Sequence, residues 1–219
     1  FLATTRTIPP PPPLAKVGAA VQSQTMGPEG LGGLPCKPFR FLFVGRIEKV
    51  KGIDLLLQAM AILIEEELDI HLTIVGKGRM EVWARDFIDK HMLGERIRLM
   101  GHVSDETLAL LYESSDCVVI PSRSESIPLV FSEALEFNKE LIVTDVGDMG
   151  MLGRQYGVAW VIPPEDPLAL KEMMKKQVES KGHEKMDDHA ASMVRGKRHE
   201  LKELFNIDTS VERFLEDYR

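Results

Sequence analysis

The sequence lacks any long apolar run. No segment approaches the roughly 18–20 consecutive apolar residues of a membrane-spanning helix, and no charged and then apolar leader precedes a small-residue cleavage site. We therefore expect no transmembrane segment and no export signal. The expected location is the cytoplasm, with peripheral association with a membrane left open.

Cysteine is scarce as well. The only two cysteines, Cys36 and Cys117, lie far apart in the sequence and fit neither a zinc-ligand spacing nor a disulfide framework. This usage favours a reducing compartment over a secreted setting. We expect no metal site.

Positive charge is in deficit. The 27 Lys and Arg residues face 34 Asp and Glu residues, which gives a formal net charge of −7, and no basic stripe runs along the chain. Nucleic-acid binding requires clustered Lys and Arg to neutralise phosphates. The composition therefore argues against a nucleic-acid-binding protein.

The N-terminal region differs in composition from the rest of the chain. Residues 1–38 hold eight of the 13 prolines, five of them consecutive from Pro9 to Pro13, and then a Gly-rich run. Proline favours an extended polyproline conformation and glycine adds freedom, so we interpret residues 1–38 as a linker or interdomain tail. A ligand for an aromatic-lined groove is the other reading of the prolines. At 219 residues, the length predicts one folded core, which we assign to residues 39–219.

From residue 39 onward, short apolar runs alternate with amphipathic stretches of helical length. The strands expected from this alternation cover residues 40–44, 70–75, 97–100, 117–120, 141–144 and 159–162. Helices are expected at 53–67, 80–92 and 105–114, another from about residue 128, and helical structure from about 166 to the end. Apolar strands separated by helices predict an α/β fold with a doubly wound, Rossmann-like parallel sheet. Ligands of such sheets bind beyond the carboxyl ends of the strands.

Two cations flank the turn after the first strand. Arg46 follows Gly45, and Lys51 precedes Gly52 at the entrance of an apolar helix. A helix N-terminus offers unpaired N–H groups and partial positive charge. Arg adds a planar fork for phosphate oxygens and Lys adds a point charge, so the pair can hold a diphosphate. The residues alone are equally consistent with two solvated loop cations.

Two carboxylates follow the fourth strand, eight positions apart. Pro128 suits the first turn of a helix, which puts Glu125 in the loop before it and Glu133 on the second turn. A carboxylate can accept hydrogen bonds from two vicinal hydroxyls, as recognition of a ribose or hexose requires. From the residues alone, Glu133 also fits a surface acid near a helix dipole.

The ordered set of these segments resembles the donor-binding half of retaining GT-B glycosyltransferases of family 4, also called glycosyl transferases group 1. The resemblance spans about residues 39–175. The segments that carry it are Val44-Gly45-Arg46, Lys51-Gly52, Ile74 to Gly78, Leu99 to Val103, Pro121-Ser122, Glu125 and Glu133-Ala134.

The resemblance implies specific roles. Arg46 and Lys51 correspond to the basic pair that holds the diphosphate of a UDP- or GDP-linked sugar, in place of a metal. Glu125 and Glu133 correspond to the Glu-x7-Glu motif, with Glu125 beside the donor sugar and Glu133 on the ribose hydroxyls. The remaining donor-binding positions are Gly45, Val103, whose loop reads the nucleobase, Ser126, and the backbone N–H groups near Leu129 and Val130.

The sequence also departs from the family pattern. Residues 126–128, Ser-Ile-Pro, replace the usual Gly-Phe-Gly, which reduces backbone freedom near the donor sugar. Asn138 stands where a glycine usually takes the left-handed conformation after the helix. The loop expected from Asp145 to Met149 keeps one glycine where the family often has two. These changes concern the identity of the sugar more than nucleotide binding.

The resemblance predicts a retaining hexosyltransferase that needs no cofactor, with polysaccharide biosynthesis as its setting. Its acceptor, a saccharide or a lipid-linked saccharide, would bind a separate N-terminal domain. Thr7 to Pro11 resembles an interdomain connection, so we expect this sequence to be an excerpt of a longer protein. One alternative is a nucleotide-sugar-binding module that is inactive alone. Another, prompted by Gly76 and Gly78, is a Rossmann-type dehydrogenase, although the third glycine of its fingerprint is missing.

Overall fold

The computed structural model describes residues 37–180, 196, 200 and 201. Most of the predicted linker, and most of the helical structure predicted after residue 180, lie outside the described residues. Leu201, in the segment predicted to be helical, is described and buried. None of the helices in the described part of the chain has the length and hydropathy needed to cross a bilayer.

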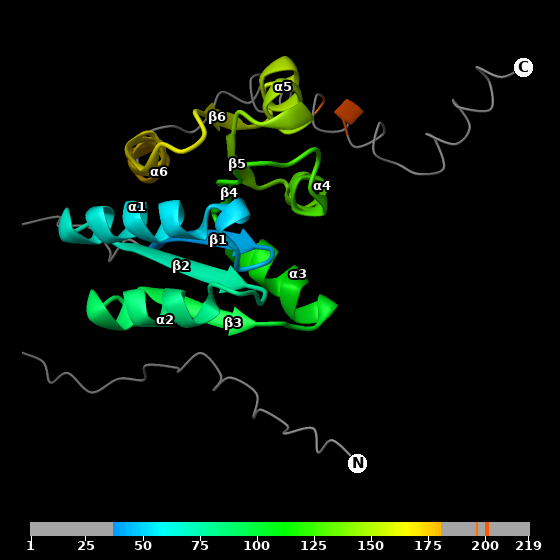
Figure 1. The fold of residues 1–219 in the computed structure, drawn as a ribbon. Helices are drawn as coiled ribbons and strands as arrows, with labels where there is room; N and C mark the ends of the chain where they lie inside the picture. The colour runs from blue at the N-terminus through cyan, green and yellow to red at the C-terminus, as the bar shows by residue number, and fades with distance from the viewer. Residues whose placement is uncertain (1–36, 181–195, 197–199, 202–219) are drawn as a thin grey trace, which may run out of the picture. The chain divides into compact units, whose positions relative to one another are not determined.

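Six strands form one parallel sheet, in the spatial order β3-β2-β1-β4-β5-β6. Each predicted strand is present, with its ends shifted by at most one residue. Figure 1 shows the strands of the sheet together with the helices that surround them. The strands are β1 (Phe39–Val44), β2 (Ile70–Val75), β3 (Ile97–Gly101), β4 (Cys117–Ile120), β5 (Glu140–Thr144) and β6 (Trp160–Ile162).

Helices cover both faces of the sheet, so the doubly wound α/β prediction is confirmed. Helices α1, α2 and α6 lie on one side and α3, α4 and α5 on the other (Figure 1). A short 3-10 turn, η1 (Lys49–Lys51), precedes α1. The helices are α1 (Ile53–Glu65), α2 (Glu81–Lys90), α3 (Asp105–Ser114), α4 (Leu129–Glu136), α5 (Gly147–Tyr156) and α6 (Pro167–Ser180).

The two faces hold two separate hydrophobic clusters, because successive strand side chains point to opposite sides. In β1, Phe41 and Phe43 join the cluster under α1, α2 and α6, whereas Leu42 joins the cluster under α3, α4 and α5. All four residues of β4 are buried. Strands buried on both faces read as continuous apolar runs, which is why they were visible in the sequence.

Helix α5 corrects one expectation. The loop expected from Asp145 to Met149 is instead the start of a helix that begins at Gly147 and ends at Tyr156. Its three glycines lower the intrinsic helix propensity, so the sequence pattern concealed it. Tertiary packing explains one of them, since a Cβ on Gly153 would lie 3.1 Å from both Ala159 and Val161.

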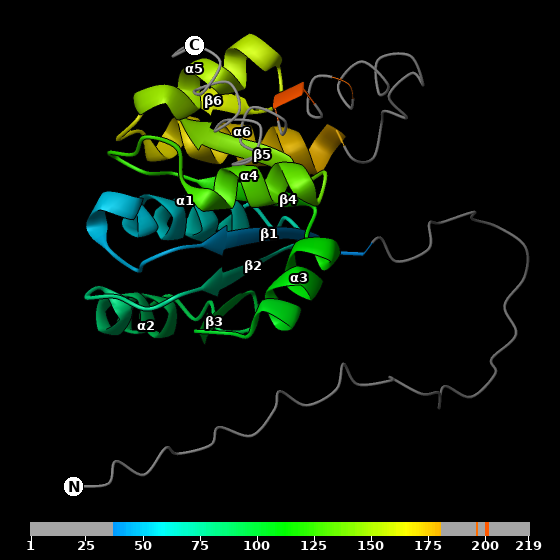
Figure 2. The ribbon, with the colours of Figure 1, turned by 90° about the vertical axis from the view of Figure 1, so that its right-hand side faces the viewer.

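The carboxyl ends of the strands meet at one edge of the sheet, which Figure 2 shows from the side. From β1 the chain moves outward through β2 to β3, and then returns to place β4 on the other side of β1. The loops after β1 and β4 therefore leave the sheet side by side and in opposite directions. Such a switch point is where open α/β sheets bind ligands.

Candidate functional site at the switch point

The loop after β1 presents two cations with different surroundings. Lys51, in η1, has a side chain that is only 20% exposed. The Arg46 side chain is 68% exposed and lies 3.3 Å from the carboxylate of Glu48. Lys51 is therefore held in place within the site, whereas Arg46 projects into solvent with a local acidic partner.

Lys51 and Glu125 form an ion pair between the two loops. The Lys51 Nζ contacts Oε2 of Glu125, although 74 positions separate the residues in the sequence. The Glu125 side chain is 17% exposed. The structure thus joins one of the predicted diphosphate ligands to the carboxylate predicted to lie beside the donor sugar.

Glu133 lies on the second turn of α4, as expected, and Glu125 lies in the preceding loop. The Tyr112 hydroxyl, from α3, donates a 2.7 Å hydrogen bond to Oε2 of Glu133. Burial, together with this hydrogen bond to a carboxylate, raises the pKa of Tyr112 above its ordinary value. The hydroxyl therefore stays protonated at neutral pH and remains a donor.

The start of α4 leaves backbone donors available. The helix has Pro128 at its N-cap and no side-chain cap. Within the described residues, no hydrogen bond uses the backbone N–H of Leu129 or Val130. Free N–H groups at a helix start can bind phosphate oxygens. Ser126, just before the helix, lies with its hydroxyl 3.4 Å from the Asp148 carboxylate.

Gly45 and Val103 also lie at the carboxyl edge of the sheet. The Gly45 N–H donates to the Val75 carbonyl at 3.0 Å, and Val103 packs partly against the cluster under α3, α4 and α5. In the described part of the chain, no hydrogen bond or ion pair joins Arg46 or Val103 to Lys51, Glu125 or Glu133. The structure therefore places all the predicted residues after strand ends or on α4, and directly pairs two of them.

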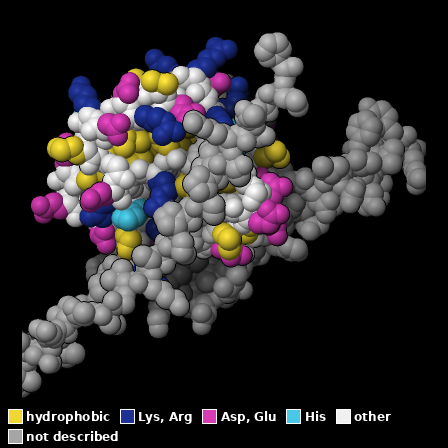
Figure 3. Space-filling model, turned by 90° about the horizontal axis from the view of Figure 1, so that it is seen from below, with side chains coloured by type: hydrophobic (Ala, Val, Ile, Leu, Met, Phe, Trp, Pro, Cys, Tyr) yellow, Lys and Arg dark blue, Asp and Glu magenta, His cyan; other side chains and the backbone are white. Residues whose placement is uncertain are grey.

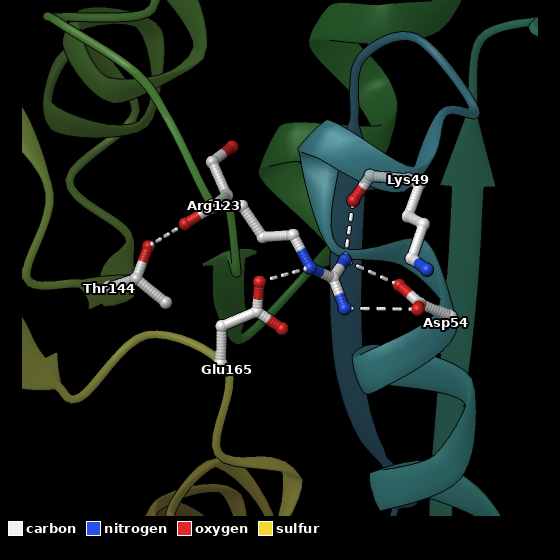
Figure 4. A network of polar contacts seen from close by, with 6 residues as sticks. Lys49, Asp54, Arg123, Thr144 and Glu165 are labelled. Atoms are coloured by element: carbon white, nitrogen blue, oxygen red, sulfur yellow. Dashed lines mark hydrogen bonds and ion pairs between the residues drawn. The ribbon is translucent and has the colours of Figure 1, made fainter.

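Arg123 anchors the two loops to each other and was missed in the sequence. Its guanidinium donates to both Asp54 oxygens, at 2.7 and 3.0 Å, to Glu165 at 2.8 Å, and to the Lys49 carbonyl (Figure 4). The backbone N–H of Arg123 donates to the Val50 carbonyl at 2.8 Å. The hydrogen bonds to Asp54 are the main cause that raises the pKa of Arg123. Arg123 thus fixes the turn that carries Lys51.

One weak signal for Arg123 is present in the sequence. It stands between the Pro121-Ser122 segment and Glu125, inside the motif that carries the resemblance, but its partners lie 42 to 74 positions away. A second anchor of this loop is Thr144, whose hydroxyl donates to the Ser122 carbonyl at 2.5 Å (Figure 4). The β4–α4 loop is therefore held from both β5 and the β1–α1 turn.

Gly76 and Gly78 have a packing explanation. A Cβ on Gly76 would lie 1.9 Å from the Gly45 carbonyl oxygen, and one on Gly78 would lie 2.3 Å from that of Ile47. The loops after β1 and β2 can therefore approach this closely only with glycine. The pair also follows β2, not the first strand, so its position gives no support to a dinucleotide fingerprint.

Charge of both signs is distributed over the surface that Figure 3 shows, where Lys and Arg side chains are interspersed with Asp and Glu. With a net charge of −7 for the whole chain, attraction of a phosphate depends on the local cations at the switch point.

The model of the glycosyl transferases group 1 family matches residues 32–195. The chain belongs to this family. It is 34% identical over 123 residues to an uncharacterised glycosyltransferase of Methanocaldococcus jannaschii, covering 56% of this chain and 31% of that protein. It is 32% identical over 124 residues to a glycogen synthase of Mycobacterium tuberculosis, covering 56% and 30%. The chain spans about a third of these relatives.

The fold matches solved glycosyltransferases of the GT-B type. Sucrose-phosphate synthase from Thermosynechococcus elongatus superimposes with a TM-score of 0.68 and 25% identity, covering 85% of this chain and 46% of that one. A pneumococcal O-GlcNAc transferase, solved with UDP and GlcNAc, gives a TM-score of 0.59 and 23% identity, covering 80% and 36%. The chain thus corresponds to one Rossmann-like half of such a fold.

Proposed function

We propose that this chain is the nucleotide-sugar-binding domain of a retaining family 4 glycosyltransferase. The observation that carries the proposal is the Lys51–Glu125 ion pair at the switch point. The start of α4 and Glu133 follow Glu125 within eight residues of the chain. The family membership and the UDP-bound structural neighbour support the same ligand class. The donor is a sugar linked to UDP or GDP.

In the proposed reaction, the bond between the sugar and the diphosphate breaks and the acceptor oxygen bonds to the sugar on the same face. The proton of the acceptor hydroxyl passes to an oxygen of the departing diphosphate. Negative charge develops on the departing diphosphate. Lys51 and Arg46 stabilise that charge without a metal, as electrostatic catalysis requires. Lys51 Nζ has three donor hydrogens, so it can keep its contact with Glu125 while it donates to a phosphate oxygen.

The surroundings of the two cations suggest a division of roles. Lys51 is oriented by Glu125 and by the turn that Arg123 fixes, so it contributes a preorganised charge. Arg46 is exposed and paired with Glu48. In this proposal it turns toward the diphosphate when the donor binds. Reorganisation of Arg46 costs side-chain entropy, so we expect Lys51 to contribute more to affinity.

The proposal assigns only donor binding to this chain. The acceptor, a saccharide or lipid-linked saccharide, binds a second domain, and residues 1–38 connect the two. The coverage of 46% of the sucrose-phosphate synthase chain supports this division. Transfer requires both substrates in one geometry.

Thermal unfolding with UDP, GDP, ADP and NAD, in the presence of EDTA, tests the proposal. Stabilisation by UDP or GDP is expected, and stabilisation by NAD alone would refute it. The variants Arg46→Ala, Lys51→Ala and Glu133→Ala should each weaken nucleoside-diphosphate binding while the fold survives. Unchanged affinity in all three variants would reject the assigned site. Arg85→Ala, which removes an exposed ion pair with Glu81 on α2, is the matched control.

A further inference from the structure

A buried phenol points at the carboxylate that we assign to ribose binding. Tyr112 is 1% exposed, and its hydroxyl donates to Oε2 of Glu133 at 2.7 Å. Within α3, all of whose residues are described, Tyr112 is the one residue that is buried. The side chain with the deepest burial in this helix therefore ends on a residue of the site.

Packing holds the phenol ring in one position. Tyr112 stacks on Phe137, with ring centroids 5.0 Å apart and an angle of 7° between the planes. Phe131, fully buried in α4, belongs to the same cluster. A ring fixed on its faces cannot move its hydroxyl without disturbing the core. The hydroxyl therefore has a defined location from which it can orient a more exposed partner.

The hydrogen bond leaves acceptor capacity on Glu133. A carboxylate offers about four lone-pair sites on its two oxygens. Tyr112 uses one of them on Oε2, and within residues 37–180, 196, 200 and 201 no other hydrogen bond or ion pair reaches the carboxylate. Oε1 and the remaining site on Oε2 can thus accept two vicinal hydroxyls. An unfixed carboxylate would lose side-chain entropy to make the same bonds.

We propose that Tyr112 is a positioning residue for ribose recognition, which orients the Glu133 carboxylate toward the 2′- and 3′-hydroxyls of a nucleoside diphosphate. The inference rests on the proposed function and deepens it. A purely structural role predicts that loss of the hydroxyl affects stability, or affects all ligands alike. A positioning role predicts an effect only on ligands that carry the two hydroxyls.

The test is calorimetric titration of the full chain and of Tyr112→Phe, which keeps the ring and removes the hydroxyl. The ligands are UDP, GDP and their 2′,3′-dideoxy forms. Tyr156→Phe is the matched control, because Tyr156 is a partly buried tyrosine of α5 that packs against the same cluster. Glu133→Gln keeps Tyr112 intact and tests the same contact from the other side.

Tyr112→Phe should weaken binding of the ribose ligand by up to roughly tenfold, the cost of ordering one otherwise unfixed side chain when the ligand binds. Its affinity for the dideoxy ligand should equal that of the wild type, as should both affinities of Tyr156→Phe. Glu133→Gln should weaken ribose binding, with little further loss in the double variant. If Tyr112→Phe binds the ribose ligand as tightly as the wild type does, or loses equal affinity for both ligands, the positioning role of Tyr112 is wrong while the proposed function still stands. If the wild type binds neither UDP nor GDP, the proposed function fails and the inference fails with it.

Discussion

Replacement of Arg123 by Ala tests how the site is held together. The Arg123 and Asp54 side chains are 15% and 14% exposed and share two hydrogen bonds, and Arg123 also donates to the Lys49 carbonyl. The change leaves the Asp54 carboxylate largely buried and without this partner. The Glu165 side chain is 62% exposed, so the Arg123–Glu165 ion pair contributes little to the free energy of unfolding.

A hydrogen bond to a charged group contributes about 1.5–3 kcal/mol, and breaking a fully buried ion pair costs about 3–5 kcal/mol. Because both side chains retain some contact with solvent, we expect Arg123→Ala to lower the free energy of unfolding by about 2–3 kcal/mol. Urea denaturation should show the midpoint falling by about 1 M. Binding of UDP or GDP should weaken as well, because the turn that carries Lys51 loses its anchor.

Arg154→Ala is the control. Arg154 also makes two hydrogen bonds to one carboxylate, that of Asp145, but these side chains are 55% and 42% exposed. Solvent screens such a pair, so we expect little change in its urea midpoint. Equal losses in the two variants would refute the argument that burial of the Arg123–Asp54 pair determines its contribution.

Two further predictions concern the backbone and pH. Gly52→Ala should lower the free energy of unfolding by more than about 2 kcal/mol in urea, because φ is +71° and the new Cβ would lie 1.9 Å from a carbonyl oxygen of the β4–α4 loop. Gly157→Ala, at φ +62° with no atom within 4 Å, should lose only about 1 kcal/mol, and equal losses would exclude the steric explanation. Burial, reinforced by the charge of Arg96, lowers the pKa of His71 in the folded state. The unfolded state therefore binds more protons below about pH 6.5, and the free energy of unfolding should decrease as the pH is lowered there. His71→Gln should flatten this dependence in urea unfolding at about pH 7.5 and 5.5; an unchanged slope would contradict the assignment.

The strands were predictable because burial on both faces makes each of them a short, nearly uninterrupted apolar run. The end of α4 was predictable for a local reason: Asn138, with φ +53°, takes the left-handed conformation expected in place of glycine. Helix α5 was missed because its three glycines lower the helix propensity, and the reason for one of them, the packing of Gly153 against Ala159 and Val161, appears only in the fold. A structural feature can be predicted from the sequence when it does not depend on contacts with distant residues.

The features of the candidate site also separate into those that local sequence predicts and those that depend on distant contacts. Glu125 and Glu133 fell at the predicted places in the loop and on α4, since Pro128 sets where that helix starts. The contact between Lys51 and Glu125 depends on β1 and β4 being neighbours, which spacing alone does not reveal. The role of Tyr112 likewise depends on how α3 packs against α4. These two contacts could be identified only from the three-dimensional structure.

We expect a nucleoside diphosphate to bind where the loops after β1 and β4 meet. Hydrogen–deuterium exchange of the full chain, with and without saturating UDP or GDP, tests it most directly. Exchange should become slower in peptides covering residues 45–52 and 126–133, and it should stay unchanged in α2. Protection confined to other parts of the chain, such as the groove lined by β6 and α6, would contradict it.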